Sequence, residues 1–146
     1  MRECIIRTSV LCAATLAAII ASPLEAQSTR PGVGAIPYFS PLPAGTTFRV
    51  WAPNATAVRV AGTFNSWSAT ANPLVSEGNG YWSADVPFAY QNSQYKFVIT
   101  GPNGTIWKND ARARRVTNSV GNSVIYNPAN YQWTRRASQR RTSTTW

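Results

Sequence analysis

The sequence predicts an all-β fold in which short antiparallel strands pack face to face as a sandwich. From residue 46 onward, apolar and polar residues alternate in short segments, which is the two-residue period of a half-buried strand. Turn residues interrupt these segments after about every ten positions. No stretch of this region has the 3.6-residue period of a long helix. The pattern is typical of an immunoglobulin-like antiparallel β-sandwich of about seven strands.

Each expected strand places its apolar side chains on one face. Phe48 and Val50 share a face of the first strand, and Val58 and Val60 share a face of the second. In the fourth strand the aromatic neighbours of Lys96 take one face, and the lysine lies on the other. A Gly-Pro-Asn-Gly turn, whose Asn-Gly pair tolerates positive φ, joins the fourth and fifth strands into a hairpin. The expected strands are 46–52, 57–64, 80–86, 94–100, 105–108 and 122–126, with a polar loop at 65–79.

The two ends of the chain differ from this central domain, which spans 46–134. Residues 1–26 have the basic start, apolar run and small residue before the cleavage point of a secretory signal peptide. The mature protein is therefore expected to be secreted or periplasmic, with no membrane attachment after signal cleavage. Residues 27–45 hold four prolines and three glycines and are expected to form a linker or an extended arm. Residues 135–146 hold four arginines and are expected to be a basic disordered tail.

The chain offers few groups for catalysis or for a cofactor. Both cysteines lie in the expected signal peptide and there is no histidine, so thiol and Ser-His nucleophiles and the commonest metal ligand are missing. Glycoside hydrolysis generally needs two carboxyl groups about 5–9.5 Å apart. The mature domain has three carboxylates, of which Glu77 and Asp110 are interpreted as solvated loop charges, and Asp85 lies on the polar face of a strand. We expect no catalytic residue, no metal site and no cofactor.

The formal net charge of +9 does not by itself indicate nucleic-acid binding. The tail supplies +4 of it, and within the domain only Arg112, Arg114 and Arg115 cluster. A nucleic-acid site would need a basic stripe interleaved with exposed aromatic side chains. We therefore expect no nucleic-acid partner, and binding through the arginine tail stays as a minor alternative.

Six tryptophans are more than so small a core needs, because a buried indole requires a partner for its N–H. Trp82 is expected in the core, with Trp51 as a second candidate. Trp67 ends the loop after the second strand, and Trp107 follows the hairpin turn, where a core does not reach. Two exposed indoles that stack on pyranose rings would give a binding free energy of about −4 to −8 kcal/mol. The alternative is that both tryptophans cap the ends of the sandwich.

Three motifs give the chain a family resemblance. The strings FRVWAPNA at 48–55, GTFNSW at 62–67 and QYKF at 94–97 resemble carbohydrate-binding module family 48. This family is the N-terminal sandwich of glycogen branching enzymes and isoamylase-type debranching enzymes in glycoside hydrolase family 13. The glycogen-binding domain of the AMP-activated protein kinase beta subunit is similar. The resemblance covers 46–134 and implies non-catalytic binding of an α-glucan polysaccharide or oligosaccharide, with Asn65 shaping the loop of the second motif.

The resemblance also implies the residues of a sugar site. Trp67 and Trp107 match the family's two stacking tryptophans, and Lys96 matches the lysine that donates hydrogen bonds to sugar hydroxyls. Val120 matches an apolar residue that wedges against the sugar ring. Asn122 falls near a family position with a hydrogen-bonding Thr or Asn, where this chain is slightly shorter.

The catalytic barrel of such enzymes is missing from the sequence. A (β/α)₈ barrel needs at least about 200 residues, and only twelve follow Thr134. We therefore expect a truncated fragment of a secreted family 13 enzyme, with a catalytic barrel domain as a possible partner and no enzyme activity in this chain alone. Two further alternatives stay open: a docking module that packs on a catalytic domain without sugar affinity, and a module of a carbohydrate esterase that binds another polysaccharide.

Overall fold

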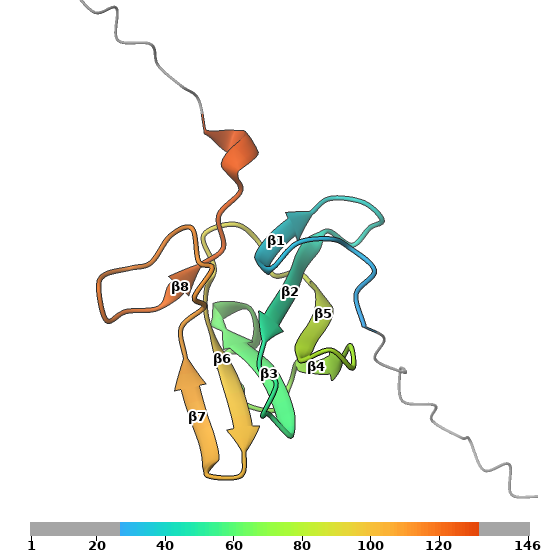
Figure 1. Ribbon diagram of the computed structural model, residues 1–146. Coiled ribbons are helices and arrows are strands. Elements are labelled where there is room, and N and C mark those ends of the chain that lie inside the picture. The colour runs from blue at the N-terminus through green and yellow to red at the C-terminus, as the bar shows by residue number, and fades with distance from the viewer. Residues whose placement is uncertain (1–26, 132–146) are drawn as a thin grey trace, which may run out of the picture.

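The computed structural model describes residues 27–131 and shows a curled antiparallel sheet folded into two packed layers (Figure 1). In this part of the chain the only helices are two single-turn 3₁₀ segments, η1 (Thr63–Asn65) and η2 (Pro128–Asn130). The strands are β1 (Gly34–Tyr38), β2 (Gly45–Trp51), β3 (Ala57–Gly62), β4 (Pro73–Ser76), β5 (Tyr81–Pro87), β6 (Gln94–Gly101), β7 (Gly104–Lys108) and β8 (Ser123–Val124).

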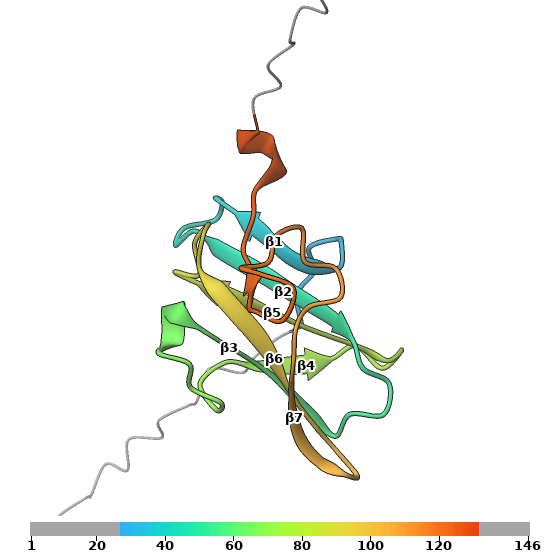
Figure 2. The same ribbon diagram turned by 90° about the vertical axis from the view of Figure 1, so that its left-hand side faces the viewer.

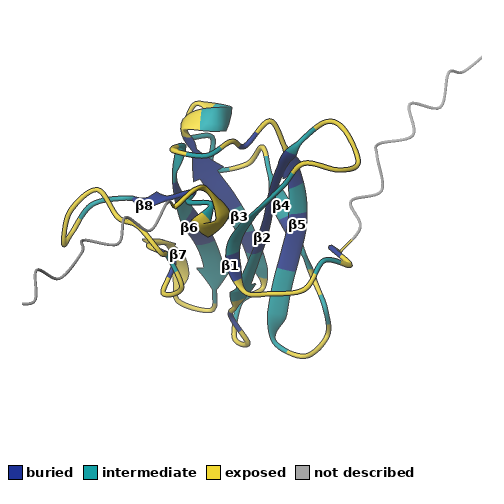
Figure 3. Ribbon diagram, turned by 90° about the horizontal axis from the view of Figure 1, so that it is seen from above, coloured by how far each residue is buried: buried dark blue, intermediate teal, exposed yellow. Residues whose placement is uncertain are grey.

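The strands run in the order β1-β2-β5-β4-β3-β6-β7, and β8 pairs with β6. Strand β4 pairs with both β5 and β3, so it carries the sheet from one layer into the other. The two layers pack against each other (Figure 2), and both contain buried segments (Figure 3). The predicted all-β, immunoglobulin-like sandwich is confirmed.

An aromatic cluster forms the centre of the core. The ring of Phe48, from one layer, lies 5.0 Å from that of Tyr95 and 6.3 Å from that of Phe97, both from the other layer. All three side chains are fully buried, as are Val58 and Val60. Alternation along β2, β3 and β6 therefore placed the core side chains correctly.

The segment 27–45, expected to be a linker, contains strand β1, so that prediction is wrong for this part of the chain. Residues Gly34–Tyr38 pair with Arg49–Gly45 of β2. Pro37 conceals the strand in the sequence, but β1 lies at the edge of the sheet, where a residue without an N–H is tolerated. Ser28 is also part of the fold, because it is buried and its N–H donates to the Ser83 hydroxyl at 3.0 Å.

Two other boundaries and one core assignment differ from the predictions. The expected loop at 65–79 contains β4, whose Leu74 enters the core. The last expected strand shrinks to Ser123–Val124. Of the two tryptophans proposed for the core, Trp82 is partly buried and donates its indole N–H to the carbonyl of Ala52 at 3.1 Å. Trp51 is not a core residue, since it is 61% exposed at the end of β2.

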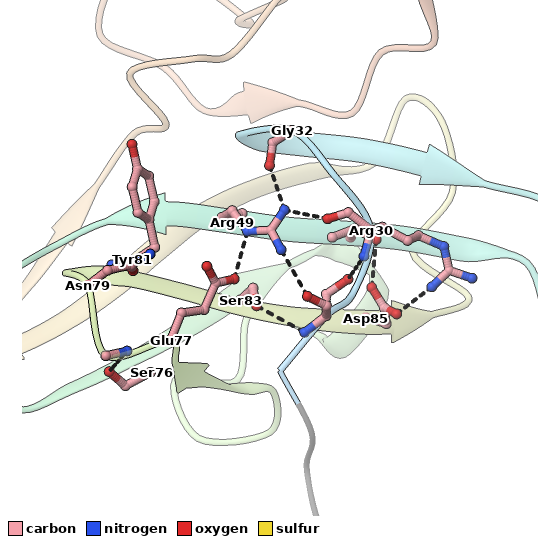
Figure 4. Close-up of polar contacts among 12 residues, drawn as sticks. Arg30, Gly32, Arg49, Ser76, Glu77, Asn79, Tyr81, Ser83 and Asp85 are labelled. Atoms are coloured by element: carbon pink, nitrogen blue, oxygen red, sulfur yellow. Dashed lines mark hydrogen bonds and ion pairs between the residues drawn. The ribbon is translucent and has the colours of Figure 1, made fainter.

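Arg49 binds the segment before β1 onto the outer face of β2 (Figure 4). Its guanidinium donates to the carbonyls of Ser28 at 2.9 Å and Gly32 at 2.8 Å, and also to the carbonyl of Arg30. Its Nε donates to Glu77 at 2.7 Å. Desolvation by burial acts to raise the pKa of Glu77, but hydrogen bonds from Ser83 and Arg49 outweigh it and lower the pKa overall.

The predictions for 1–26, 132–134 and 135–146 lie outside the described residues. No helix within the described part of the chain is long and apolar enough to cross a membrane.

Candidate functional site

The outer face of the layer formed by β3, β6 and β7 carries a row of site candidates. Lys96 and Val98 share this face of β6, because alternation directs Tyr95 and Phe97 into the core. The register sets Lys96 opposite Ala61 of β3 and Val98 opposite Trp107 of β7. Ala61 and Val98 are only 0% and 1% exposed, so other side chains cover this face although it points away from the core.

The loop that holds Trp67 is shaped by Asn65, as predicted. The Asn65 side-chain oxygen accepts from the N–H of Gly62 at 2.9 Å, and its amide donates to the carbonyl of Val60 at 3.0 Å. Ser66 and Trp67 then take positive φ angles of 54° and 60°, a conformation that non-glycine residues adopt rarely. The N–H of Trp67 donates back to the carbonyl of Gly62 at 2.8 Å. These bonds turn the chain sharply at the end of β3.

Trp67 and Trp107 lie next to each other. Their ring centroids are 6.5 Å apart and their planes meet at 39°. Trp107 is 45% exposed on β7, an edge strand within the described sheet, and Trp67 is half-buried. The two indoles form a tilted aromatic surface beside the β6 row that carries Lys96.

The turn at 117–122 brings two further candidates to the same region. The side-chain amide of Asn122 donates to Gln94 at 2.7 Å, and Gln94 lies on β6 two residues before Lys96. Val120, at the tip of the turn, is 84% exposed. The amide of Asn109, just after β7, donates to the carbonyl of Gly121 at 2.5 Å and ties the turn to the end of that strand.

The structure therefore assembles most of the predicted site. Trp67 and Trp107 form one surface, Lys96 lies in the adjoining row, and Asn122 is joined to that row through Gln94. Sequence reasoning missed Gln94 and Asn109 as residues that position the turn. The alternation of β6 could have pointed to Gln94, because it shares the polar face of Lys96.

Comparison with known families identifies the domain. Residues 34–113 match the model of carbohydrate-binding module 48, the isoamylase N-terminal domain. The chain belongs to this family.

The relatives of this family-48 module are much longer proteins. The chain is 47% identical over 91 residues to a 1,4-alpha-glucan branching enzyme of Streptomyces avermitilis, covering 61% of this chain and 11% of the enzyme. It is 41% identical over 93 residues to a 1,4-alpha-glucan branching enzyme of Xanthomonas oryzae pv. oryzae, covering 61% of this chain and 13% of the enzyme. It thus spans about a tenth of the curated relatives' length.

Solved structures share the fold of the module. The type I pullulanase of Bacillus subtilis, solved in complex with maltose, superposes with a TM-score of 0.58 at 24% identity, covering 73% of this chain and 14% of that one. A putative alpha amylase from Salmonella typhimurium gives a TM-score of 0.55 at 23% identity, covering 72% of this chain and 16% of that one. At this identity the likeness concerns the fold alone.

The carboxylates of the module's described residues have structural partners, and the interpretation of Glu77 and Asp110 as solvated loop charges is wrong. Asp110 is 6% exposed and accepts from the Tyr95 hydroxyl at 2.6 Å. Burial and the adjacent Asp110 carboxylate raise the pKa of Tyr95. Glu77 pairs with Arg49, and Asp85 accepts from the Thr47 hydroxyl at 2.6 Å.

Within residues 27–131 no cluster of three or more His, Cys, Asp or Glu side chains could hold a metal ion. An aromatic surface beside a lysine and amides, with the carboxylates engaged elsewhere, suits reversible binding of a neutral polyhydroxyl ligand.

Proposed function

We propose that this chain is a non-catalytic module that binds α-glucan through the outer face of the β3, β6 and β7 layer. The observation that carries the proposal is the pairing of Trp67 and Trp107, 6.5 Å apart, beside the polar row of β6. The binding residues are Trp67, Lys96, Trp107, Val120 and Asn122.

The chemistry of this face matches that of a glucose polymer. The flat, apolar side of a pyranose ring covers an indole face and leaves its hydroxyls free at the ring edge. The Lys96 ammonium offers three donors and the Asn122 amide offers both donors and an acceptor for those hydroxyls. If stacking on sugar resembles stacking on bases, each indole contributes about 1–3 kcal/mol. Binding in the micromolar to millimolar range is expected, at about −4 to −8 kcal/mol.

The biological setting is also part of the proposal. The relatives named above are glucan-branching enzymes, which supports α-1,4/α-1,6 glucan as the ligand and a glycoside hydrolase family 13 enzyme as the protein type. We propose that this chain supplies the N-terminal module of such an enzyme. The pattern of residues 1–26 supports secretion or periplasmic localisation.

Titration with maltoheptaose or β-cyclodextrin, followed by tryptophan fluorescence, tests binding. The wild-type spectrum is expected to change until the site is saturated. Trp67→Ala is expected to weaken the affinity about 5- to 150-fold. Tyr90→Ala, which removes a 51% exposed aromatic side chain from another loop, is the matched control and should bind like wild type. A spectrum that stays unchanged for both wild type and Trp67→Ala contradicts the proposal.

A pull-down panel of starch, glycogen, xylan and cellulose tests the choice of polysaccharide. Retention on starch and glycogen alone is expected. Retention on xylan or cellulose instead would favour the module of a carbohydrate esterase.

A second candidate function is docking on a catalytic domain without sugar affinity. Phe39 and Leu42, in the β1–β2 loop, are 66% and 82% exposed, and Phe88, just after β5, is 60% exposed. The N–H of Phe88 donates to the carbonyl of Ala44 at 3.0 Å, so the two loops lie side by side. If this surface is the functional one, Leu42→Ser will weaken co-purification with a family 13 barrel, whereas Trp67→Ala will leave it unchanged.

A further inference from the structure

A groove opens between the end of β2 and the hairpin formed by β6 and β7, on the side of that hairpin that faces the core. Its volume is about 400 Å³, within the range of about 300–1,000 Å³ usual for small-molecule sites. It is separate from the face that carries Trp67 and Lys96, neither of which lines it. The lining residues that matter here are Trp51, Asn54, Ile99, Asn103, Ile106 and Lys108.

Trp51 is the aromatic wall of this groove. Its side chain is 61% exposed, although it ends a core strand. The Nε1 edge of the indole lies close to Gly80. A Cβ atom at position 80 would be 3.1 Å from the Trp51 Nε1 and 3.2 Å from the Pro53 Cβ. Gly80, with φ of 87°, therefore admits a close approach of the indole that a larger residue would obstruct. The rest of the ring stays open to a ligand.

The floor of the groove is apolar because the hairpin extends past the opposite layer. Ile106 of β7 pairs with Ile99 of β6. Both lie on the same face as Phe97, which is buried in the core two residues earlier on β6. The hairpin projects beyond the sandwich (Figure 1), and Ile106 is left 49% exposed. A core-facing surface is thus uncovered at this end.

Polar groups line the same groove. Asn54 and Asn103, which lie in two different turns, and Lys108 of β7 are among the lining residues. An indole wall with a few amides and one cation is the combination expected for a pyranose ring with its edge hydroxyls. Trp67 and Trp107, Asn122, and Lys96 supply the same three kinds of group to the proposed glucan-binding face.

The groove and that face meet along one strand. Ile106 and Lys108 lie on the groove side of β7, and Trp107, between them, lies on the other side. Within the described residues β7 pairs only with β6, so its outer edge is open. A polymer that crosses this edge contacts Trp107 on one side and the groove on the other.

We propose that the groove lined by Trp51 and Lys108 is a second α-glucan subsite, which lets one glucan chain engage both faces of the β6–β7 hairpin. This inference rests on the proposed function, since it takes the ligand class from the face that carries Trp67 and Trp107. Trp51 supplies the stacking surface, and Asn54, Asn103 and Lys108 supply donors and acceptors to hydroxyls.

Titration of the ¹⁵N-labelled full chain with maltotriose, followed by the indole N–H signals, tests the subsite. The Trp51 signal is expected to shift in wild type and also in the Trp67→Ala/Trp107→Ala double variant. For maltoheptaose, Trp51→Ala is expected to weaken binding about 5- to 150-fold, and Trp51→Phe, which keeps an aromatic face, to recover part of that loss. Ile106→Ser should weaken binding in the same direction without altering the tryptophan itself.

The outcomes separate the two proposals. A Trp51 signal that stays fixed while those of Trp67 and Trp107 shift overturns the subsite and leaves the proposed function standing. A Trp51 shift that disappears in the double variant is an indirect effect and also overturns the subsite. Fixed signals for Trp67 and Trp107 count against the proposed function. A dimer in light scattering that Trp51→Ala and Ile106→Ser both dissociate would make the groove a self-association surface instead.

Discussion

Replacing Arg49 by alanine should show that the segment before β1 belongs to the folded domain. The Arg49 guanidinium donates to the carbonyls of Ser28, Arg30 and Gly32 and to the carboxylate of Glu77. Alanine removes all of these bonds and leaves Glu77 without its cation in a partly buried setting. The substitution therefore releases the N-terminal segment and also leaves the Glu77 carboxylate without its ion-pair partner.

The size of the effect follows from burial of the pair. The side chains of Arg49 and Glu77 are only 11% and 15% exposed. Removing one partner of a buried ion pair costs about 3–5 kcal/mol, and we expect about 3 kcal/mol here because Glu77 retains some contact with water. A domain of this size has a total stability of about 5–15 kcal/mol. A loss of 3 kcal/mol corresponds to a fall in Tm of about 12–24 °C.

Thermal unfolding followed by circular dichroism, on chains that begin at Gln27, measures this change. Arg49→Lys keeps the charge but lacks the planar fork, so it should recover only part of the loss. In a chain that begins at Val33 the three carbonyls are gone, and Arg49→Ala should cost clearly less than in the longer chain. An Arg49→Ala chain whose Tm falls by less than about 4 °C, or an equal cost in both chains, would refute the reasoning.

Three further predictions concern Glu77, Tyr95 and Asn65. Because the folded-state pKa of Glu77 is lowered, its stabilising effect is complete above the unfolded pKa and is lost as the pH falls through the folded one. Denaturant midpoints between about pH 6 and pH 2 should therefore fall less steeply for Glu77→Gln than for wild type. Tyr95→Phe should cost about 1.5–3 kcal/mol in chemical denaturation, because the buried Asp110 carboxylate loses a donor at 2.6 Å. Since the Tyr95 pKa is raised, the wild type should also lose stability above about pH 10, and Tyr95→Phe should lose less; equal slopes would contradict this. Asn65→Ala should weaken maltoheptaose binding in the fluorescence assay by releasing the Trp67 loop, and binding equal to wild type would show that the loop holds without it.

The parts of the fold that sequence reasoning predicted are those with a local signal. Alternation of apolar residues around Phe48, Val58 and Tyr95 identified the core faces, because a strand directs successive side chains to opposite sides whatever its partners are. The same rule places Trp51 on the face opposite Val50, so its exposure was predictable from β2 alone. The expectation that Trp51 is a second core residue was therefore wrong.

The parts that were missed depend on partners distant in the chain. Strand β1 reads as a linker because Pro37 interrupts it, and only its pairing with β2 makes it a strand. Asp110 looks like a solvated loop charge until the Tyr95 hydroxyl is placed beside it. No spacing along the sequence encodes either contact.

The candidate site divides in the same way. The sequence by itself determined the fold class, since strand alternation and turn residues act over a few positions. Its family resemblance also proposed Trp67, Lys96 and Trp107 as site residues. Only the tertiary structure decided that the two indoles lie 6.5 Å apart, and that Trp51 opens a separate groove across β7. Both results depend on strand register and on how far the β6–β7 hairpin extends past the other layer, which are properties of the packed sheets rather than of any one segment.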